Sequence, residues 1–285
     1  MAWRVDSETG VLRDVLLCRP DHYSWQPTNS IARATLERGS AFDRDAASRQ
    51  YGEMVAALEE AGVRCHYLAP EPHLPYQVYT RDSSQTTPWG PVLTQLFRPQ
   101  RRGEYASVLD FHQCDGAGFW RMGSAGTLEG GDIHVIRPGL LLVGWTGERT
   151  DLAGARQFAG WFEAEGWEVR LEPFAEHFLH LDVLFCMVAD GLAVACTDVL
   201  DDALLAWLRG HGIRLLPVSY KAAMEMGCNV LALGGGRVVS PRHNAELNAR
   251  LRAEGLRVLD PELDLFTMGG GGVHCMTMPL RRDTP

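Results

Sequence analysis

The sequence predicts a closed five-bladed α/β propeller that forms a single domain over residues 1–285. Three observations predict it: a helix–glycine–strand–loop–hairpin unit recurs along the chain, the last unit lacks one hairpin strand, and the N-terminal segment contains an unpaired strand. With 285 residues and 46% hydrophobic content, the chain is long enough to bury a large core.

Four of the units contain a helix, a glycine and a short apolar strand in that order. In the first unit Tyr51, Met54 and Leu58 recur at helical spacing, and Gly62 separates this helix from its strand. The helices are expected over residues 42–61, 150–165, 201–210 and 244–254, with Thr150 as the N-cap of the second. The strands are expected over residues 63–68, 167–171, 213–218 and 256–259. A less regular copy around Gly118 makes five units.

After its strand, each unit continues into a polar loop and then a β-hairpin. The hairpins are expected to turn at residues 88–90, 138–139, 190–191 and 234–236, where Gly, Pro and Asp are concentrated. The fifth unit has one hairpin strand, 276–280, while residues 15–18 resemble a strand without a partner. Pairing these two segments would close the ring and remove a sheet edge.

The polar loops carry side chains that are typical of catalytic sites. Because each loop occupies the same place in its unit, a ring would bring all five loops to one central site. They supply Asp82, Glu129, Asp132, His180, Asp182, Asn229 and Cys275. Carboxylates, an imidazole and a thiol that meet on one axis predict catalysis rather than a packed core.

Cys275 and His180 are the predicted nucleophile and acid–base group. Four glycines at 269–272 precede Cys275 and would let the backbone approach a ligand closely. His180 and Asp182 are two positions apart, which on a strand would point both side chains to the centre. A loop beside a buried cysteine and a core histidine are the ordinary interpretations, but the other converging polar loops argue against them.

Three alternatives stay open from the residues alone. Glu129 and Asp132 could flank a solvated turn, and Asp82 could form a surface ion pair with Arg81. Cys, His, Asp and Glu are also zinc ligands, so a metal held jointly by His180 and Asp182 remains an alternative. The sequence contains no CxxC and no His-x₃-His spacing to favour it.

Charge and composition limit the classes of partner. With 36 acidic and 27 basic residues the net charge is −9, which disfavours nucleic acid and anionic membranes and suits a small cationic substrate. No segment approaches membrane-spanning length, and the N-terminus lacks an apolar signal segment. Seven scattered cysteines predict reduced thiols and a cytoplasmic protein. A homo-oligomer is left open.

Four motifs resemble the guanidino-group-modifying superfamily of arginine deiminases, dimethylarginine dimethylaminohydrolases, arginine dihydrolases and amidinotransferases. In chain order they are Thr80-Arg81-Asp82, Leu128-Glu129-Gly130-Gly131-Asp132, His180-Leu181-Asp182 and Gly272-Val273-His274-Cys275-Met276-Thr277-Met278-Pro279-Leu280. The resemblance covers nearly the whole chain and implies the pentein-type, five-bladed α/β propeller. The segment 147–151 and the Met-x-Met-Pro-Leu ending look most like arginine deiminases, although His274 stands where many of these have Arg.

The resemblance also implies a role for each matching residue. Cys275 would be the nucleophile, His180 the general acid and base, and Glu129 its support. The substrate-binding residues would be Asp82 and Asp182 on the guanidinium, Arg101 and Arg149 on an α-carboxylate, and Asp132, Tyr79 and Asn229 around them.

The expected reaction is deimination of arginine to citrulline and ammonia through a covalent thiouronium, without a cofactor. A dimethylated nitrogen would leave one buried carboxylate unpaired, at a cost of about 1–3 kcal/mol or more, so an unsubstituted guanidinium is favoured. Dimethylarginine hydrolysis, arginine dihydrolysis and amidino transfer are the alternatives. A non-catalytic arginine-binding module would have no need of Cys275.

Overall fold

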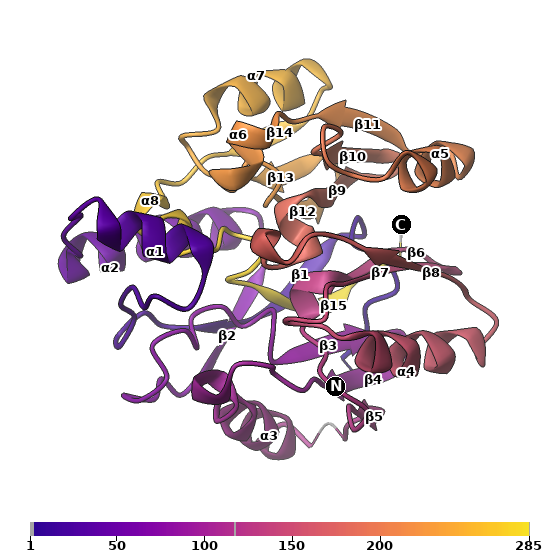
Figure 1. Cartoon of the computed structure of the whole chain (residues 1–285), viewed down its shortest axis with the longest axis horizontal. Helices are drawn as coiled ribbons and strands as arrows, with labels where there is room; N and C mark the ends of the chain where they lie inside the picture. Colours follow the sequence, from indigo (N-terminus) through magenta and orange to yellow (C-terminus); the bar gives the residue numbers. More distant parts are fainter. Residues whose placement is uncertain (1–2, 117, 285) are drawn as a thin grey trace.

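The computed structural model describes residues 3–116 and 118–284, whose strands form five three-stranded sheets. In each sheet an antiparallel pair is extended by one parallel strand. The longer helices lie on the outside, and the strands lie toward the middle (Figure 1). The chain therefore has an α/β fold built from five similar units.

The five sheets follow one another along the chain. The first contains β1 (Leu12–Cys18), β2 (Arg64–Leu68) and β15 (Met278–Arg282), and the second β3 (Ser84–Thr87), β4 (Gly90–Leu93) and β5 (Arg121–Met122). The others contain β6 (Ile133–Arg137), β7 (Leu140–Trp145) and β8 (Glu168–Pro173); β9 (Phe185–Ala189), β10 (Leu192–Ala195) and β11 (Arg214–Pro217); and β12 (Leu231–Gly234), β13 (Arg237–Val239) and β14 (Arg257–Leu259).

A helix precedes the parallel strand of every sheet. These helices are α2 (Arg44–Glu60), α3 (Glu104–Cys114), α4 (Leu152–Glu163), α5 (Asp202–Gly210) and α7 (Ala245–Ala253). Shorter helices are α1 (Ser30–Glu37), α6 (Tyr220–Met224) and α8 (Asp264–Thr267), and 3₁₀ turns span Pro99–Arg101, Gly130–Asp132, Glu176–Phe178 and Leu181–Val183. The four helices expected from the sequence are confirmed, whereas α1, α3, α6 and α8 were not predicted.

The N-cap predicted for α4 is wrong by one residue. Asp151, not Thr150, caps this helix, because its Oδ1 accepts a hydrogen bond from the Gly154 backbone at 2.8 Å. The Thr150 hydroxyl instead accepts a hydrogen bond from the Glu129 backbone N–H at 3.0 Å. A side chain that could have capped the helix is thus used to fix a central loop.

The two chain ends meet in one sheet, as the missing hairpin strand predicted. Strand β1 pairs antiparallel with β15 and parallel with β2. Neighbouring sheets also contact one another through β15 and β3, β9 and β12, and β1 and β12.

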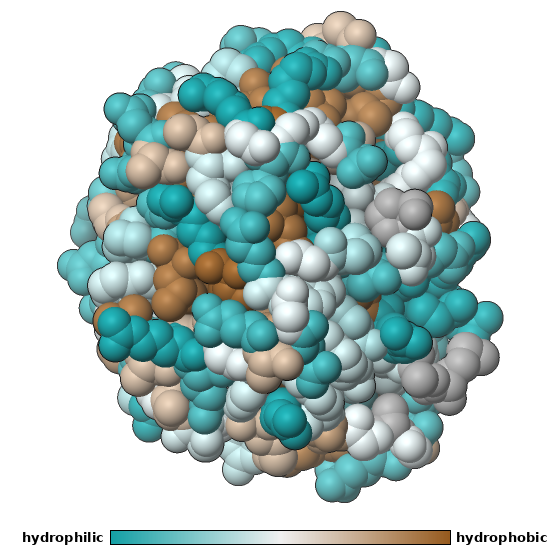
Figure 2. All heavy atoms as spheres, turned by 90° about the vertical axis from the view of Figure 1, so that its right-hand side faces the viewer, coloured by the Kyte–Doolittle hydropathy of each residue, from teal (hydrophilic) through white to brown (hydrophobic). Residues whose placement is uncertain are grey.

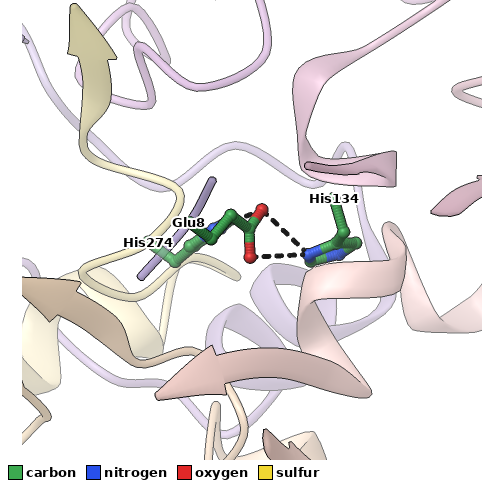
Figure 3. Close-up of side chains that lie close together, drawn as sticks. All are labelled: Glu8, His134 and His274. Carbon is green, nitrogen blue, oxygen red and sulfur yellow. Dashed lines mark hydrogen bonds and ion pairs between the residues drawn. The ribbon is translucent and has the colours of Figure 1, made fainter. Parts of the chain in front are cut away.

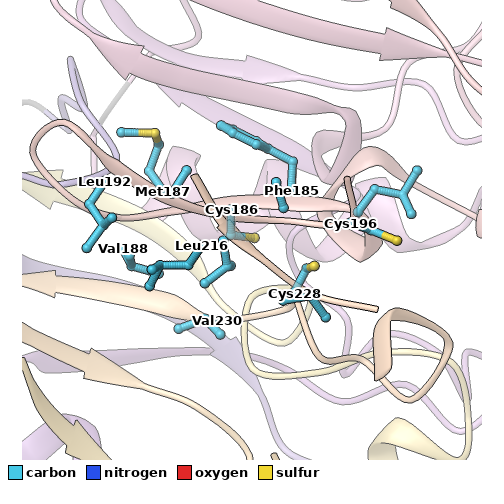
Figure 4. Packing of buried hydrophobic residues seen from close by; sticks show 14 of the residues in the cluster. Phe185, Cys186, Met187, Val188, Leu192, Cys196, Leu216, Cys228 and Val230 are labelled. Carbon is cyan, nitrogen blue, oxygen red and sulfur yellow. The ribbon is translucent and has the colours of Figure 1, made fainter. Parts of the chain in front are cut away.

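The largest apolar cluster packs the sheet of β9, β10 and β11 against α5 and α7 (Figure 4). Three cysteines, Cys186, Cys196 and Cys228, are buried within it as free thiols. Burial raises the pKa of Cys186 and Cys228 well above the usual thiol value, so these two behave as small apolar side chains. Cys114 is exposed and Cys65 half-buried, so two of the seven cysteines lie outside the core.

The outer surface is mostly polar. On the face shown in Figure 2, hydrophilic residues dominate and apolar side chains gather only in limited patches. Among the described residues, no helix is both long and apolar enough to cross a membrane.

Candidate active site

Three of the five polar loops, those that carry Asp82, His180 and Cys275, line a pocket of about 310 Å³, its mouth included. Its lining residues are Asn29, Tyr76, Tyr79, Asp82, Arg101, Arg149, Leu179, His180, Gly270 and Cys275. Six of these, Tyr79, Asp82, Arg101, Arg149, His180 and Cys275, were predicted as site residues. Gly270 belongs to the glycine run that was expected to approach a ligand, and the sequence analysis missed Asn29, Tyr76 and Leu179.

Cys275 presents a buried thiol at the base of this pocket. Its Sγ lies 3.1 Å from the amide nitrogen of Asn229 and 3.2 Å from Asp182 Oδ2. Burial and the nearby Asp182 and Asp82 carboxylates raise its pKa well above the usual thiol value. In the free protein the thiol is therefore protonated at neutral pH, and its proton can be donated to Asp182.

The glycines before Cys275 allow close packing, mainly against protein rather than ligand. A Cβ on Gly271 would lie 2.3 Å from the ring of Tyr79, and one on Gly272 would lie 2.6 Å from Asn229 Oδ1. Only Gly270, with φ of +98°, lines the pocket. The predicted close approach is thus real, but it positions the cysteine loop against Tyr79 and Asn229.

His180 is held by Glu129 on the opposite wall. Its Nε2 lies 2.7 Å from Glu129 Oε2, and its Nδ1 lies 3.6 Å from Asp82 Oδ1. Burial would lower the pKa of His180, but Asp82, Asp132 and Glu129 outweigh burial and raise it to about 10. His180 is therefore an imidazolium at neutral pH and has a proton to give.

The expectation that His180 and Asp182 share a strand is wrong. Residues Leu181–Val183 form a 3₁₀ turn, closed by a 3.2 Å hydrogen bond from the Val183 N–H to the His180 carbonyl. The preceding Leu179 has a positive φ of 69°. Both side chains still reach the centre, but His180 turns to Glu129 and Asp182 to Cys275.

Two carboxylates each keep one oxygen without a hydrogen-bond donor. Asp82 Oδ2 accepts from Arg101 Nη1 at 2.6 Å, and Asp182 Oδ2 accepts from His274 Nδ1 at 2.8 Å. Within residues 3–116 and 118–284, Asp82 Oδ1 and Asp182 Oδ1 are buried and have no hydrogen-bond partner. A buried carboxylate oxygen without a donor is unfavourable, so both are suited to receive N–H groups from a ligand.

The two arginines of the pocket are engaged to different extents. Arg101 donates to both oxygens of Glu104 at 2.8 Å and to Asp82. Arg149 makes one long contact, 3.5 Å from Nη1 to Glu129 Oε2, among the described residues. Arg149 therefore has the N–H groups to spare, whereas Arg101 mainly fixes Asp82.

Four predicted site residues lie outside the pocket lining: Asp132, Asn229, Glu129, which contacts His180, and Asp182, which contacts Cys275. Asp132 Oδ1 accepts the Leu181 N–H at 2.8 Å and so holds the turn that carries His180. Burial raises the pKa of Asp132 to about 7.

Asn229 donates a hydrogen bond to the Cys275 thiol and, through Oδ1, accepts the His274 N–H at 2.9 Å. The ring of Tyr79 lines the pocket, and its hydroxyl donates to the Phe266 carbonyl at 2.9 Å.

Among the described residues, two side-chain groups bring three metal-ligand atoms within 4.8 Å of one another. The first is Asp82, Glu129 and His180, and the second is Glu8, His134 and His274, shown in Figure 3. The first includes the protonated His180, which has no lone pair to offer, and contacts Arg101 and Arg149. In the second group, the positive charge of Arg81 lowers the pKa of both Glu8 and His274. Their charges favour hydrogen bonding over a cation, and the pair considered from sequence, His180 with Asp182, forms neither group.

Known proteins match the chain over nearly its whole length. Residues 20–282 match the family model described as eukaryotic N,N dimethylarginine dimethylhydrolase. The chain belongs to this family. It is thereby a member of the guanidino-group-modifying superfamily that the sequence motifs indicated, with close similarity to arginine deiminases.

Three relatives illustrate the range of this superfamily. The uncharacterized protein YkgA of Bacillus subtilis is 29% identical over 97% of this chain and 94% of its own. The arginine deiminase of Rhodococcus jostii is 30% identical over 87% and 69%. A structure of an AgrE variant with L-arginine superposes with a TM-score of 0.85 at 21% identity, over 97% of this chain and about two fifths of AgrE, and so supports the fold alone.

Proposed function

We propose that this protein hydrolyses the guanidinium group of arginine or a close analogue, with Cys275 as nucleophile and citrulline and ammonia as products. One observation carries the proposal: the free oxygens of Asp82 and Asp182 are buried and lack donors within the described chain, beside a buried thiol. A planar cation with N–H groups on its edges supplies what these oxygens lack.

The fold supports this arrangement if the five sheets are the blades of a closed propeller, which we also propose. Pairing of β1 with β15 joins the chain ends in one blade, and each polar loop lies between a parallel strand and the next hairpin. The pocket then lies on the axis of the ring. Distant sequence positions reach one substrate because each unit contributes one loop.

Binding of the cation activates the thiol. In the free protein Asp82 and Asp182 oppose loss of the Cys275 proton. A guanidinium held between these carboxylates compensates their charge, so the pKa of the thiol falls and its proton leaves to solvent. The thiolate is thus formed where its target carbon is already in place.

His180 then serves as acid and as base. The thiolate adds to the guanidinium carbon, and the His180 imidazolium gives a proton to the departing nitrogen, which leaves as ammonia. The neutral His180 next removes a proton from water, whose oxygen adds to the thiouronium carbon. Collapse of this second adduct forms the C=O of citrulline and releases the sulfur together with one proton, which restores the thiol.

Arg149 is the best-placed group for a substrate carboxylate. It lines the pocket and has spare N–H groups, whereas most of those of Arg101 are used by Glu104, Asp82 and backbone carbonyls. We therefore assign the α-carboxylate to Arg149, with Arg101 contributing mainly through Asp82.

Hydrolysis of dimethylarginine is the second candidate, because the matching family model carries that name. The pocket favours an unsubstituted guanidinium, since two methyl groups on one nitrogen remove its N–H donors and leave one of the carboxylate oxygens unpaired. The difference between the two substrates is expected to be on the order of 1–3 kcal/mol.

The assay compares arginine, dimethylarginine, agmatine and guanidinoacetate, and measures ammonia, dimethylamine, citrulline and ornithine. Citrulline and ammonia from arginine, lost in Cys275→Ser, are the expected result. Preference for dimethylarginine with release of dimethylamine would select the second candidate, and ornithine from arginine would indicate dihydrolysis or amidino transfer. Turnover of none of these compounds would refute the proposal.

A further inference from the structure

The segments that carry Asp82 and Cys275 separate two cavities, because consecutive residues of each segment line different cavities. Asp82 and Cys275 line the substrate pocket. Their chain neighbours Arg81 and His274 line a second cavity of about 320 Å³, its opening to solvent included, which we name the rear chamber. Glu8, Gln85 and Arg282 also line it. None of these five polar residues lines the substrate pocket, so the chemistry proposed above leaves them without a role.

His274 connects the rear chamber to the active site. Its Nδ1 lies 2.8 Å from Asp182 Oδ2, the same oxygen that lies 3.2 Å from Cys275 Sγ. On its other side the His274 ring stacks on His134 at 5.7 Å, and Glu8 lies between the two histidines (Figure 3). One oxygen of Asp182 is therefore shared by His274 and the thiol.

The direction of this hydrogen bond follows from the protonation states. Burial and Arg81 lower the pKa of His274 to about 4, against the opposing effect of Asp182. For Asp182 burial acts to raise the pKa, but the hydrogen bond with His274 and the nearby histidines together outweigh it, and the value falls to about 2. At neutral pH an ionised carboxylate can only accept, so the single N–H of the neutral His274 ring is on Nδ1.

We propose that His274 is a positioning residue for the guanidinium site, which holds Asp182 by one oxygen so that the other faces the substrate. This assignment rests on the proposed function for its catalytic consequence. Two effects follow from the geometry. The Asp182 carboxylate cannot rotate to place both oxygens on the thiol, and part of the charge on Oδ2 is neutralised beside the sulfur.

The rear chamber keeps the His274 ring in place. The Arg81 side chain donates from Nε to the His274 carbonyl at 3.2 Å, and its backbone N–H donates to the Cys275 carbonyl at 3.1 Å. Glu8 is hydrogen-bonded to His134 Nδ1 at 3.3 Å, and its carboxylate lies 3.9 Å from His274 Nε2. Burial would raise the pKa of Glu8, but His134, His274 and Arg81 lower it to about 2, so Glu8 balances part of the arginine charge.

The test compares His274→Ala with His274→Asn, because the Asn side-chain amide can place an N–H near the position of Nδ1. The first readout needs no substrate: the pH dependence of Cys275 alkylation by iodoacetamide, followed on the Cys275 peptide by mass spectrometry. In His274→Ala the thiol pKa should rise by about one unit, since Asp182 Oδ2 regains its full charge. The Asn variant should stay within a few tenths of a unit of the wild type.

Turnover provides the second readout. With whichever guanidino compound is processed, kcat/KM should fall about 100-fold in His274→Ala and less than 10-fold in His274→Asn. His134→Asn is the matched control, because it alters a buried histidine of the same cluster that does not contact Asp182. It should leave both the thiol pKa and kcat/KM nearly unchanged.

A double-mutant cycle distinguishes positioning from packing. When Asp182 is already Asn, removal of His274 should not shift the thiol pKa further. Equal losses in the Ala and Asn variants, an equal loss in His134→Asn, or an additive cycle would each overturn the assignment. If His274→Ala fails to fold, His274→Leu, which fills most of the ring volume but offers no N–H, takes its place in both readouts and in the cycle. Failure of every guanidino substrate refutes the proposed function but leaves the alkylation result to judge His274 separately.

Discussion

Two buried histidines line different cavities, His180 the substrate pocket and His274 the rear chamber, and their pKa values move in opposite directions. Against the effect of burial, the carboxylates of Asp82, Asp132 and Glu129 raise the pKa of His180 to about 10. Burial and Arg81 lower the pKa of His274 to about 4, although Asp182 is in contact. Three carboxylates outweigh burial at His180, whereas at His274 burial, with Arg81, outweighs Asp182 and Glu8. The fold thus provides one proton donor and one neutral hydrogen-bond donor from the same residue type.

The largest loss of activity is expected when the proton donor is removed. His180→Gln should lower kcat by about 10³-fold, because a positioned general acid and base contributes about 10²–10⁴-fold. Single-turnover kinetics that follow ammonia release and product formation separately should show both steps slowed. A kcat within tenfold of the wild type would remove His180 from both proton transfers.

The other half of the site is tested through Asp182. Asp182→Asn should lower kcat/KM for arginine by about 100-fold, because one charge-assisted contact to the guanidinium is lost. Activity with dimethylarginine should fall less, since the unpaired buried charge that disfavours the methyl groups is gone. The measurement is kcat/KM for both compounds in both proteins. An equal fall for both would show that Asp182 does not discriminate at the guanidinium.

The α-carboxylate of the substrate distinguishes the proposed roles of Arg149 and Arg101. Arg149→Ala should lower kcat/KM for arginine by about 10–100-fold and leave agmatine, which lacks the α-carboxylate, nearly unaffected. Loss of Arg101 should affect both compounds, because this residue fixes Asp82. If Arg149→Ala weakens arginine and agmatine equally, the carboxylate is held elsewhere.

The smallest effect concerns stability, where the two histidines should have opposite pH dependences. The folded pKa of His180, about 10, lies above its ordinary value, so its stabilisation is complete at low pH and is lost as the pH rises toward 10. The folded pKa of His274, about 4, lies below the ordinary histidine value of about 6.5. Its stabilisation is therefore lost as the pH falls from about 6.5 toward 4.

Urea unfolding from pH 4 to 10 can test this contrast. The stability advantage of the wild type over His180→Gln should shrink at alkaline pH, and its advantage over His274→Asn should shrink at acid pH. Parallel curves for wild type and variants would contradict the assigned protonation states.

The repeating pattern predicted the architecture better than the local geometry. The unpaired strand at residues 15–18 and the half-hairpin at 276–280 indicated that the chain ends pair, and they do. The polar loops indicated which side chains converge. The turn at Leu181–Val183 was not predictable from period-two spacing, because alternation in so short a segment does not distinguish a strand from a 3₁₀ turn.

The residues that hold the site residues in place act mostly through contacts between distant segments. Glu8 reaches His134 from 126 positions away, and His274 reaches Asp182 across 92 positions. No local pattern marks such pairs. Glu104 was more accessible to sequence reasoning, because it follows Arg101 by three residues, the spacing of a side-chain pair on one helical turn.

The most direct test of the account is to look for the covalent intermediate. Rapid acid quenching of the wild-type protein during turnover of arginine, followed by peptide mass spectrometry, should show an amidino adduct on Cys275. The account predicts that this adduct forms and decays at rates compatible with kcat, accumulates in His180→Gln if water attack becomes limiting, and is absent in Cys275→Ser. Citrulline formation with no adduct on Cys275 under any quench time, or undiminished turnover by Cys275→Ser, would contradict the account.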